Sequence, residues 1–385
     1  MNAERIILNL AQIINRIVPK KDNQIFFYSS PDYSDNARIL FEKICESGNK
    51  NNYSFVWAVN DYKNYKNRIK RATVVKHRTL RNLWHYCRSR YIIRTHSLWG
   101  NRYVHGKQIM CVAWHGMHFK GYTQKDLRKP GDVYFDHFCV TAPIFAPMYS
   151  HIFSVPVENF DVTGLPRDDY LFDENNEIID VLNLGRFKKR IIWMPTYRST
   201  NMARATEGKE TEFGIPLLRR EDLSILNEKL KQLNYCLVLK LHHWASESIG
   251  ELDYSNIIEI KDKDIPEPYS LYHLIAKMDA MLSDYSSVWG DFLLLNRPIG
   301  FAFDDLEEYK KSRTMELDPI EDYMPGMRIK NTEDLFVFFD SLELEDKYIE
   351  ERKRIADIFL AYQDGNSSIR FLNAIGLKGF ENEKI

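Results

Sequence analysis

The sequence predicts an α/β protein of two doubly wound domains, each a parallel sheet covered by helices on both faces. Short apolar, strand-like segments alternate with helical patterns along most of the chain, which is typical of βαβ units. The alternation stops at a charged connection, residues 172–188, and then starts again. The 385 residues suffice for two or three domains, and a hydrophobic fraction of 44% excludes disorder as the main state.

The first run of βα units is predicted between residues 25 and 114. Its helix is expected over residues 36–47, where apolar residues recur with helical spacing. Its strands are expected at residues 25–29, 55–59, 73–76, 91–95 and 110–114.

The second run predicts a second sheet of the same kind. Its helices are expected at residues 221–233, 270–277 and 287–295. We place one domain at residues 21–175 and the other at 176–385, with the last helix able to cross back to the first domain. Ligands of doubly wound sheets bind at the carboxyl ends of the strands, so we expect a site in a cleft that both domains face. The strands are expected at residues 190–194, 236–241, 257–260, 280–283 and 299–303.

Residues 1–20 predict an amphipathic helix that ends at Pro19. Two interpretations stay open: the apolar face docks on the first domain, or it lies in a membrane surface with a basic flank. Polar residues interrupt the apolar ones, so neither a signal peptide nor a membrane-spanning segment is expected. The apolar positions are Ile6, Ile7, Leu10, Ile13, Ile14 and Ile17.

The charges of the chain nearly cancel, with 53 Lys and Arg against 54 Asp and Glu. This balance excludes a protein that coats nucleic acid over its whole surface. The cancellation is uneven, because residues 1–150 hold 24 basic and 10 acidic residues. Residues 51–100 alone hold 11 basic residues and one acidic residue. They form either a solvated helical face or a surface attracted to anionic lipid head groups.

The five cysteines are scattered, odd in number and without a C-x-x-C pair. They indicate reduced thiols of a cytoplasmic protein rather than disulfides or a zinc site. No metal-binding motif is present, and no tightly bound cofactor is expected. The adjacent acids Asp168–Asp169 and Asp304–Asp305 are interpreted as surface carboxylates.

The strongest chemical signal is the segment 281–292, where a strand is followed at once by Asp284, Ser286 and Ser287. Hydroxyls and free backbone N–H groups at the start of a helix form an anion site, so the segment can cradle a diphosphate. Ordinary N-capping by serine is the alternative. The spacing matches neither a Walker nor a Rossmann glycine pattern.

Two histidines follow predicted strands, one in each domain. His115 and Gly116 come after the strand at 110–114, where a neutral imidazole can accept a proton from a hydroxyl. Lys240 and His242 alternate at the end of the strand at 236–241 and suit a phosphate. A lone histidine is more often a hydrogen-bonded core residue, but two histidines at strand ends, one in each domain, favour a site.

Two further segments lie at strand ends or near the domain boundary. Thr196 and Arg198 add a hydroxyl and a guanidinium after the strand at 190–194, and a guanidinium suits phosphate. Gly164 to Asp169, which includes Arg167, is explained by a turn as well as by function.

In this order and spacing the motifs resemble the CDP-glycerol glycerophosphotransferases of teichoic acid and capsule synthesis. The resemblance covers about residues 25–375. It implies a GT-B-like pair of Rossmann domains, an acceptor domain followed by a CDP-donor domain, in a cytoplasmic, peripheral membrane transferase. The matching segments are 27–36, 55–57, 114–116, 164–171, 195–198, 284–288, 291–292, 297–298, 305–309 and 364–368.

The resemblance also implies roles for individual residues. His115 matches the residue regarded as the catalytic base, and His242 matches the second essential histidine. The donor phosphates are expected at Lys240, Thr196, Arg198, Asp284, Ser286, Ser287 and Arg167. The chain departs from the family at Met117-His118-Phe119, at His243 and at Asp168. Gly116, His118 and Lys120 are the candidates for the acceptor side.

The predicted reaction moves glycerol phosphate from CDP-glycerol to a hydroxyl of a lipid-linked saccharide or polyol-phosphate acceptor, with release of CMP. An anionic membrane surface is an expected partner, and nucleic acid is not. The alternatives are a CDP-ribitol phosphotransferase, a GT-B nucleotide-sugar glycosyltransferase and, more distantly, a non-catalytic nucleotide- or glycan-binding module.

Overall fold

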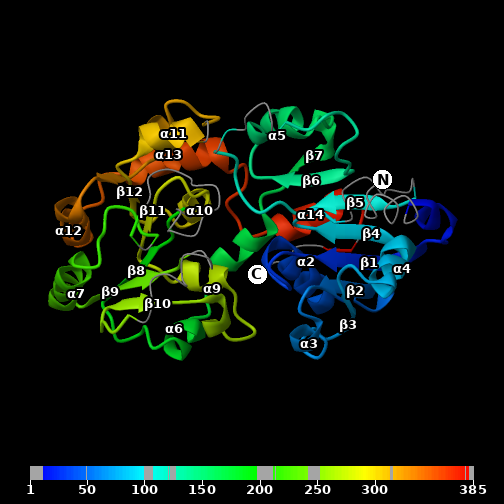
Figure 1. The fold of residues 1–385 in the computed structure, drawn as a ribbon, viewed down its shortest axis with the longest axis horizontal. Coiled ribbons are helices and arrows are strands. Elements are labelled where there is room, and N and C mark those ends of the chain that lie inside the picture. Colours follow the sequence, from blue (N-terminus) through cyan, green and yellow to red (C-terminus); the bar gives the residue numbers. More distant parts are fainter. Residues whose placement is uncertain are drawn as a thin grey trace. The chain divides into compact units, whose positions relative to one another are not determined.

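A computed structural model describes residues 12–48, 50–98, 107–119, 121, 127–196, 211–212, 214–241, 252–312, 315–377 and 379–380. The chain divides into two compact units (Figure 1). Unit 1 comprises Met1–His115, Asp126–Asp169 and Ala361–Ile385, and unit 2 comprises Gly116–Lys125 and Tyr170–Leu360. The predicted boundary at residues 175 and 176 lies near the change at Asp169, but the segment after His115 belongs to unit 2.

Unit 1 contains a seven-stranded, fully parallel sheet in the order β3-β2-β1-β4-β5-β6-β7. The order reverses between β1 and β4, which is the switch point where doubly wound sheets bind ligands. The strands are β1 (Lys21–Tyr28), β2 (Ser54–Val59), β3 (Ala72–Lys76), β4 (Ser89–Arg94), β5 (Ile109–Val112), β6 (His137–Val140) and β7 (Phe160–Val162). The helices are α2 (Asp35–Glu46), α3 (Tyr62–Tyr65), α4 (Leu80–Arg88), α5 (Phe145–Phe153) and α14 (Ser367–Ala374).

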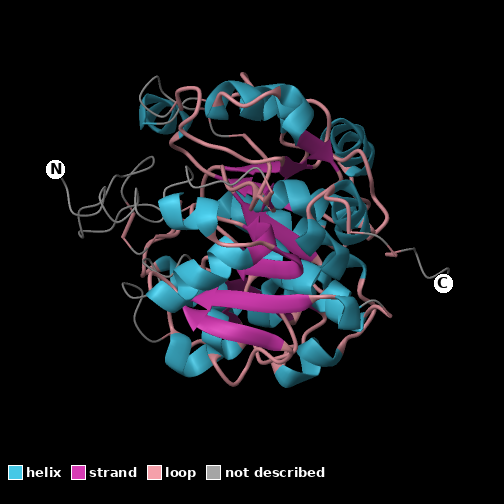
Figure 2. Cartoon of the chain, turned by 90° about the vertical axis from the view of Figure 1, so that its right-hand side faces the viewer, coloured by secondary structure: helices cyan, strands magenta, loops and turns pink. Residues whose placement is uncertain are grey.

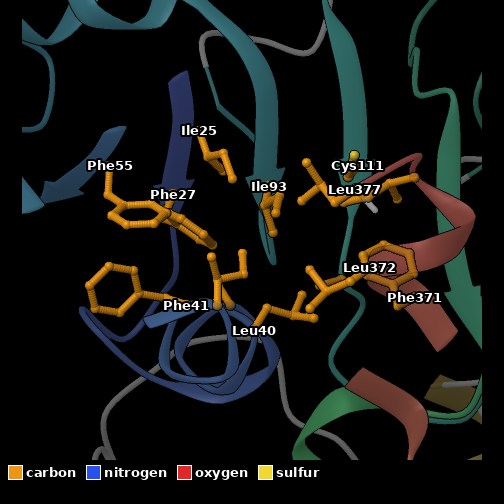
Figure 3. Packing of buried hydrophobic residues seen from close by; sticks show 14 of the residues in the cluster. Ile25, Phe27, Leu40, Phe41, Phe55, Ile93, Cys111, Phe371, Leu372 and Leu377 are labelled. Carbon is orange, nitrogen blue, oxygen red and sulfur yellow. The ribbon is translucent and has the colours of Figure 1, made fainter. Parts of the chain in front are cut away.

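Helices cover both faces of this sheet because β1 is apolar on both sides. Phe27 packs with Leu40 of α2 and Phe371 of α14 in one buried cluster (Figure 3). The next side chain along the strand, Phe26, points to the opposite face. There it meets the ring of Tyr86 from α4 edge-on, at 5.8 Å. The two-sided burial explains why the strand is a continuous apolar run.

Unit 2 contains a six-stranded, fully parallel sheet in the order β10-β9-β8-β11-β12-β13. This is the strand order of a Rossmann domain, with its switch point between β8 and β11. The strands are β8 (Lys189–Trp193), β9 (Tyr235–Leu239), β10 (Ile257–Glu259), β11 (Ala280–Ser283), β12 (Ile299–Ala302) and β13 (Met327–Ile329). The helices are α6 (Glu177–Val181), α7 (Asp222–Leu233), α9 (Leu271–Ala276), α10 (Val288–Phe292), α11 (Leu306–Ser312), α12 (Thr332–Ser341) and α13 (Ile349–Phe359).

The core of unit 2 joins its strands to α7 and α12, whose residues Leu226 and Phe339 are fully buried. The segment that follows His115 packs on α10. There Phe119 stacks on Trp289 with 4.5 Å between ring centroids. A Cβ atom on Gly290 would lie 2.6 Å from the sulfur of Met117, so any side chain at this position would displace Met117. Figure 2 shows the parallel strands flanked by helices, so the predicted α/β class is confirmed.

Two expectations from composition can be compared with the described residues. The five cysteines, Cys45, Cys87, Cys111, Cys139 and Cys236, are all free thiols, as the sequence predicts. Among the described residues, no helix has the length and apolar character that crossing a bilayer requires.

Candidate active site

The carboxyl edge of the unit 1 sheet brings two histidines together. His115 follows β5, and the backbone N–H of Ala113 still donates to the Arg94 carbonyl at the end of β4. His96 follows β4 and stacks on His115, with 4.7 Å between ring centroids and 8° between ring planes. The ring of Trp114 also contacts His115, at 4.1 Å. The predicted base therefore lies between aromatic neighbours, one strand from the switch point.

Polar contacts tie the start of α2 to the segment behind His115. The Asn36 side chain accepts a 2.7 Å hydrogen bond from the Arg167 backbone N–H and donates to the Trp114 carbonyl. The Arg167 guanidinium pairs with Asp35 at 3.0 Å. Asp35 has a left-handed φ of +58°. Such backbone strain in a non-glycine residue gathers at functional sites.

The environment of His115 favours a neutral imidazole. Burial, followed by the charge that a protonated His96 would carry and by Arg167, lowers its pKa to about 4. Asp35 and a hydrogen bond with the Thr95 backbone oppose this shift and raise the pKa. A neutral ring beside a carboxylate can accept a proton and have the resulting charge balanced.

In unit 2 the carboxylate of Asp284 sits at the switch point between β8 and β11. It is fully buried and accepts hydrogen bonds from the backbone N–H of Thr196 at 2.8 Å and from its hydroxyl at 2.7 Å. The backbone N–H of Ser286 donates to the same oxygen at 3.2 Å. Ser286 and Ser287 are half-buried, whereas the residues on either side of them are buried. Asp284 thus fixes the start of a segment whose two serines stay partly exposed.

The adjacent acids are not the surface carboxylates that the sequence analysis expects. Only Asp304 is exposed, whereas Asp168, Asp169 and Asp305 are buried. Asp305 accepts a 3.0 Å hydrogen bond from the hydroxyl of Tyr285. The interpretation fails because these carboxylates find donors from distant segments, which adjacency in sequence does not reveal.

Asp169 shows how two of the sequence motifs meet. Its carboxylate accepts hydrogen bonds from the backbone N–H groups of Ser367 and Ser368, at 2.7 and 2.9 Å, at the start of α14. Burial raises the pKa of Asp169 to about 6, and these hydrogen bonds lower it. A Cβ atom on Gly164 would lie 2.3 Å from the Ser367 hydroxyl oxygen. Residues 164–169 and 364–368 therefore pack together in unit 1.

The remaining predicted site residues are placed as follows. Lys240 follows β9, and its ammonium pairs with Asp262 at 2.9 Å. His118 and Gly116 are buried in unit 2, where His118 lies 3.7 Å from Glu316 and burial lowers its pKa to about 4. Their assignment to the acceptor side stays a prediction. His242, Arg198 and Lys120 lie outside the described residues.

Sequence reasoning assigns no role to Asp35, Asn36 or His96. The first two fall within segment 27–36, which matches the family pattern but suggests no chemical role for its residues. His96 carries no such signal, because its partner lies on a different strand. Within the described ranges, no three His, Cys, Asp or Glu side chains are grouped so as to hold a metal ion.

Two Rossmann-type units with polar residues at the carboxyl edges of their strands place the protein in the GT-B-like class of α/β proteins. The chain belongs to the CDP-glycerol:poly(glycerophosphate) glycerophosphotransferase family, whose model matches residues 10–377. The resemblance described in the sequence analysis is therefore confirmed.

Curated relatives carry the names of teichoic acid enzymes. The chain is 26% identical to a teichoic acid poly(glycerol phosphate) polymerase of Bacillus spizizenii, over 86% of this chain and 88% of the relative. It is 30% identical to a teichoic acid glycerol-phosphate primase of Bacillus subtilis, over 66% and 61% of the two chains. A ribitol-phosphate primase of Bacillus spizizenii is 28% identical over 63% and 59%. The matches to the two primases thus span about three fifths of each primase.

Solved structures agree on the fold. The wall teichoic acid polymerase TagF superposes with a TM-score of 0.77 and 21% identity, covering 97% of this chain and 93% of TagF. A UDP-N-acetylglucosamine 2-epimerase structure from Listeria monocytogenes superposes with a TM-score of 0.51 and 13% identity, over 92% and 96%. At these identities the likeness establishes the architecture.

Proposed function

We propose that the protein moves glycerol phosphate from CDP-glycerol to a hydroxyl of a lipid-linked glycan or polyol-phosphate acceptor, with release of CMP. This activity would serve the synthesis of a teichoic-acid-like or capsule polymer of the cell wall. The observation that carries the proposal is the half-buried His115 at the carboxyl edge of a sheet, where its surroundings lower its pKa, in a chain that matches the family over residues 10–377.

In the proposed reaction the acceptor oxygen bonds to the β-phosphorus of CDP-glycerol, and the bond from that phosphorus to the oxygen of CMP breaks. His115 takes the proton of the acceptor hydroxyl, and CMP leaves with the electron pair of the broken bond. Phosphoryl transfer depends mainly on positioning and charge stabilisation, so no covalent intermediate is needed.

The donor phosphates are assigned to unit 2. Ser286 and Ser287 would donate hydroxyl hydrogen bonds, and Thr196 would line the same edge. Asp284 would act by holding these residues, because its carboxylate already accepts hydrogen bonds from Thr196 and Ser286. Lys240, Arg198 and His242 would stabilise charge on the phosphate oxygens, and Arg167 would support the base through Asp35.

A second donor has specific support. The relatives include a ribitol-phosphate primase that is as similar to this chain as the glycerol enzymes are. CDP-ribitol is therefore the second candidate donor, with the same reaction at the same phosphorus.

A donor screen tests the proposed activity. The purified chain should release CMP from CDP-glycerol in the presence of a lipid-linked disaccharide analogue, and much less from CDP-ribitol or from UDP-sugars. The measurement is CMP by chromatography, with acceptor-free reactions as the control. A preference for CDP-ribitol would select the second candidate. Release of UDP with transfer of a sugar would reject both CDP-glycerol and CDP-ribitol as donors.

We also propose that unit 1 binds an anionic membrane on the cytoplasmic side, where a lipid-linked acceptor lies. Leu80 and Trp84, one turn apart on α4, are 84% and 47% exposed, and the Arg88 guanidinium covers the Trp84 ring at 5.4 Å. Nearby, residues 12–17 are helical and turn Ile13 and Ile17 to solvent. Exposed apolar side chains beside basic ones suit the interface of an anionic bilayer.

The helix at residues 12–17 and α4 belong to one surface. The Lys20 ammonium donates to the carbonyl of Asn15 and to the carbonyl of Cys87 in α4, both at 2.6 Å. Asn15 is buried and donates to Gln108 at 2.8 Å. The described part of the helix thus buries a polar residue and exposes isoleucines, which favours the membrane interpretation over docking of the apolar face.

Vesicle binding tests this surface. Charge reversal of four exposed basic residues should weaken binding to phosphatidylglycerol-containing vesicles at least tenfold, since each basic residue near such a surface contributes about 1 kcal/mol. These residues are Lys70, Arg71, Arg78 and Arg81. Trp84→Ser should weaken it as well, whereas Ile225→Ser, at an exposed apolar site of unit 2, should not. Binding should fall with added salt. Equal binding of the unaltered protein to phosphatidylcholine vesicles would contradict the proposal.

A further inference from the structure

His96 is the residue outside the assigned site with the closest relation to His115. Its imidazole lies parallel to that of His115, with an interplanar angle of 8°. The two residues come from the ends of β4 and β5, which are neighbours in the sheet. Both rings are half-buried. The stack is therefore a contact between two adjacent strand ends on the edge that carries the site.

The orientation of His96 is held at three points. Its Nδ1 lies 2.9 Å from the Thr95 hydroxyl oxygen. Its carbonyl accepts a hydrogen bond from the buried Arg94 guanidinium at 3.1 Å. The backbone N–H of Thr95 donates to the Tyr28 carbonyl at 3.1 Å, which fixes the segment to β1. A ring held in this way presents a fixed face to its neighbour.

The stack disfavours a second proton on the two rings. A charge on His96 lowers the pKa of His115, because two imidazolium rings in contact repel each other. Burial is the main cause that lowers the pKa of His96 itself, and Arg94 adds to it while Asp35 opposes it. Arg167, which pairs with Asp35, is the remaining charged group facing His115. Both rings are therefore neutral at pH 8, and a charge on His96 would make His115 harder to protonate.

We propose that His96 is a positioning residue for His115, which fixes the plane of the base and keeps it unprotonated until the acceptor hydroxyl attacks the β-phosphorus. The proposal rests on the proposed function, in which His115 is the base. His96 takes no proton from the substrate and contacts neither donor nor acceptor in this role.

Two variants separate positioning from a structural role. His96→Ala removes the stacked ring, which lets water reach His115 and takes away the charge that His96 would carry when protonated. The pKa of His115 should therefore rise toward its ordinary value. His115 works when unprotonated, so the acid limb of the pH profile of kcat/KM should move up by about one pH unit. At pH 8, kcat should fall about tenfold while KM for CDP-glycerol stays within about twofold. His96→Phe retains a stacked ring, so kcat should be largely preserved and the limb should move less than in His96→Ala.

The controls keep the result interpretable. His151→Ala removes an exposed histidine of the same unit and should leave kcat, KM and the pH profile unchanged. NMR titration of labelled histidine should show the upward pKa shift of His115 in His96→Ala without reference to activity. Thermal unfolding shows whether a variant has lost its fold. If His96→Ala is unfolded, the proposal is tested with His96→Phe.

The outcomes distinguish the positioning role of His96 from the proposed function on which it rests. An unchanged acid limb in His96→Ala, with His115→Ala inactive, would overturn the positioning role and leave the proposed function standing. Normal turnover in His115→Ala would instead show that His115 is not the base. Equal losses in the Ala and Phe variants, with the acid limb unmoved, would also overturn the positioning role.

Discussion

Replacing His115 by alanine should lower the rate of CMP release by a factor of about 10² to 10⁴, the usual contribution of a general base. The imidazole is the group placed to take the proton, and its neighbours His96 and Asp35 would remain without it. Binding of CDP should change little, because the donor residues are assigned to unit 2. The measurements are CMP release under saturating donor and CDP affinity by calorimetry.

The pH dependence of the unaltered enzyme gives a second measure of the same residue. With the pKa of His115 at about 4, kcat/KM should stay level from pH 8 to about pH 5 and fall at lower pH, as the base becomes protonated. An anionic donor bound nearby would raise this pKa, so the acid limb of kcat should lie at higher pH. Normal turnover in His115→Ala, or an acid limb near pH 6.5 for kcat/KM, would contradict the assignment.

Replacing Asp284 by alanine should lower the free energy of unfolding by about 2–5 kcal/mol, because three donors, two of them buried, lose their acceptor. Those donors are the N–H and hydroxyl of Thr196 and the N–H of Ser286. Affinity for CDP should fall at least tenfold, since the serine segment would no longer be fixed. The measurements are denaturant unfolding and calorimetry with CDP.

Two substitutions sharpen this test. Asp284→Asn keeps an acceptor oxygen of the same size and should lose less stability than the alanine variant. Asp304→Ala removes an exposed carboxylate of the same unit and should change stability by no more than about 0.5 kcal/mol. A stable Asp284→Ala variant with unchanged CDP affinity would show that the carboxylate does not hold the segment.

Strands with continuous apolar runs were predictable from sequence. The runs at β1, β9 and β11 stand out because both faces of a parallel sheet are buried, so successive side chains are all apolar. The strands β7 and β13 span three residues each. Each has a charged residue at its centre, whereas the equally short β10 (Ile257–Glu259) begins with two isoleucines and was predicted.

Residues of the candidate site were predictable where a polar side chain comes directly after an apolar strand. His115 and the pair Ser286 and Ser287 stand directly after apolar runs, so their place at the sheet edge follows from the chain itself. The role of Asp284 did not follow, because its partner Thr196 is 88 positions away. Asp305 was misjudged for a similar reason, since its donor Tyr285 comes from another loop.

By itself the sequence determined that this protein has two parallel sheets, which side chains end their strands and which family it belongs to. Those properties depend on local patterns of burial and on motifs that are read along the chain. Only the tertiary structure decided that His96 stacks on His115 and that Asp284 joins β8 to the segment after β11. Such contacts depend on which strands become neighbours, and strand order is set by packing over the whole unit rather than by any local pattern.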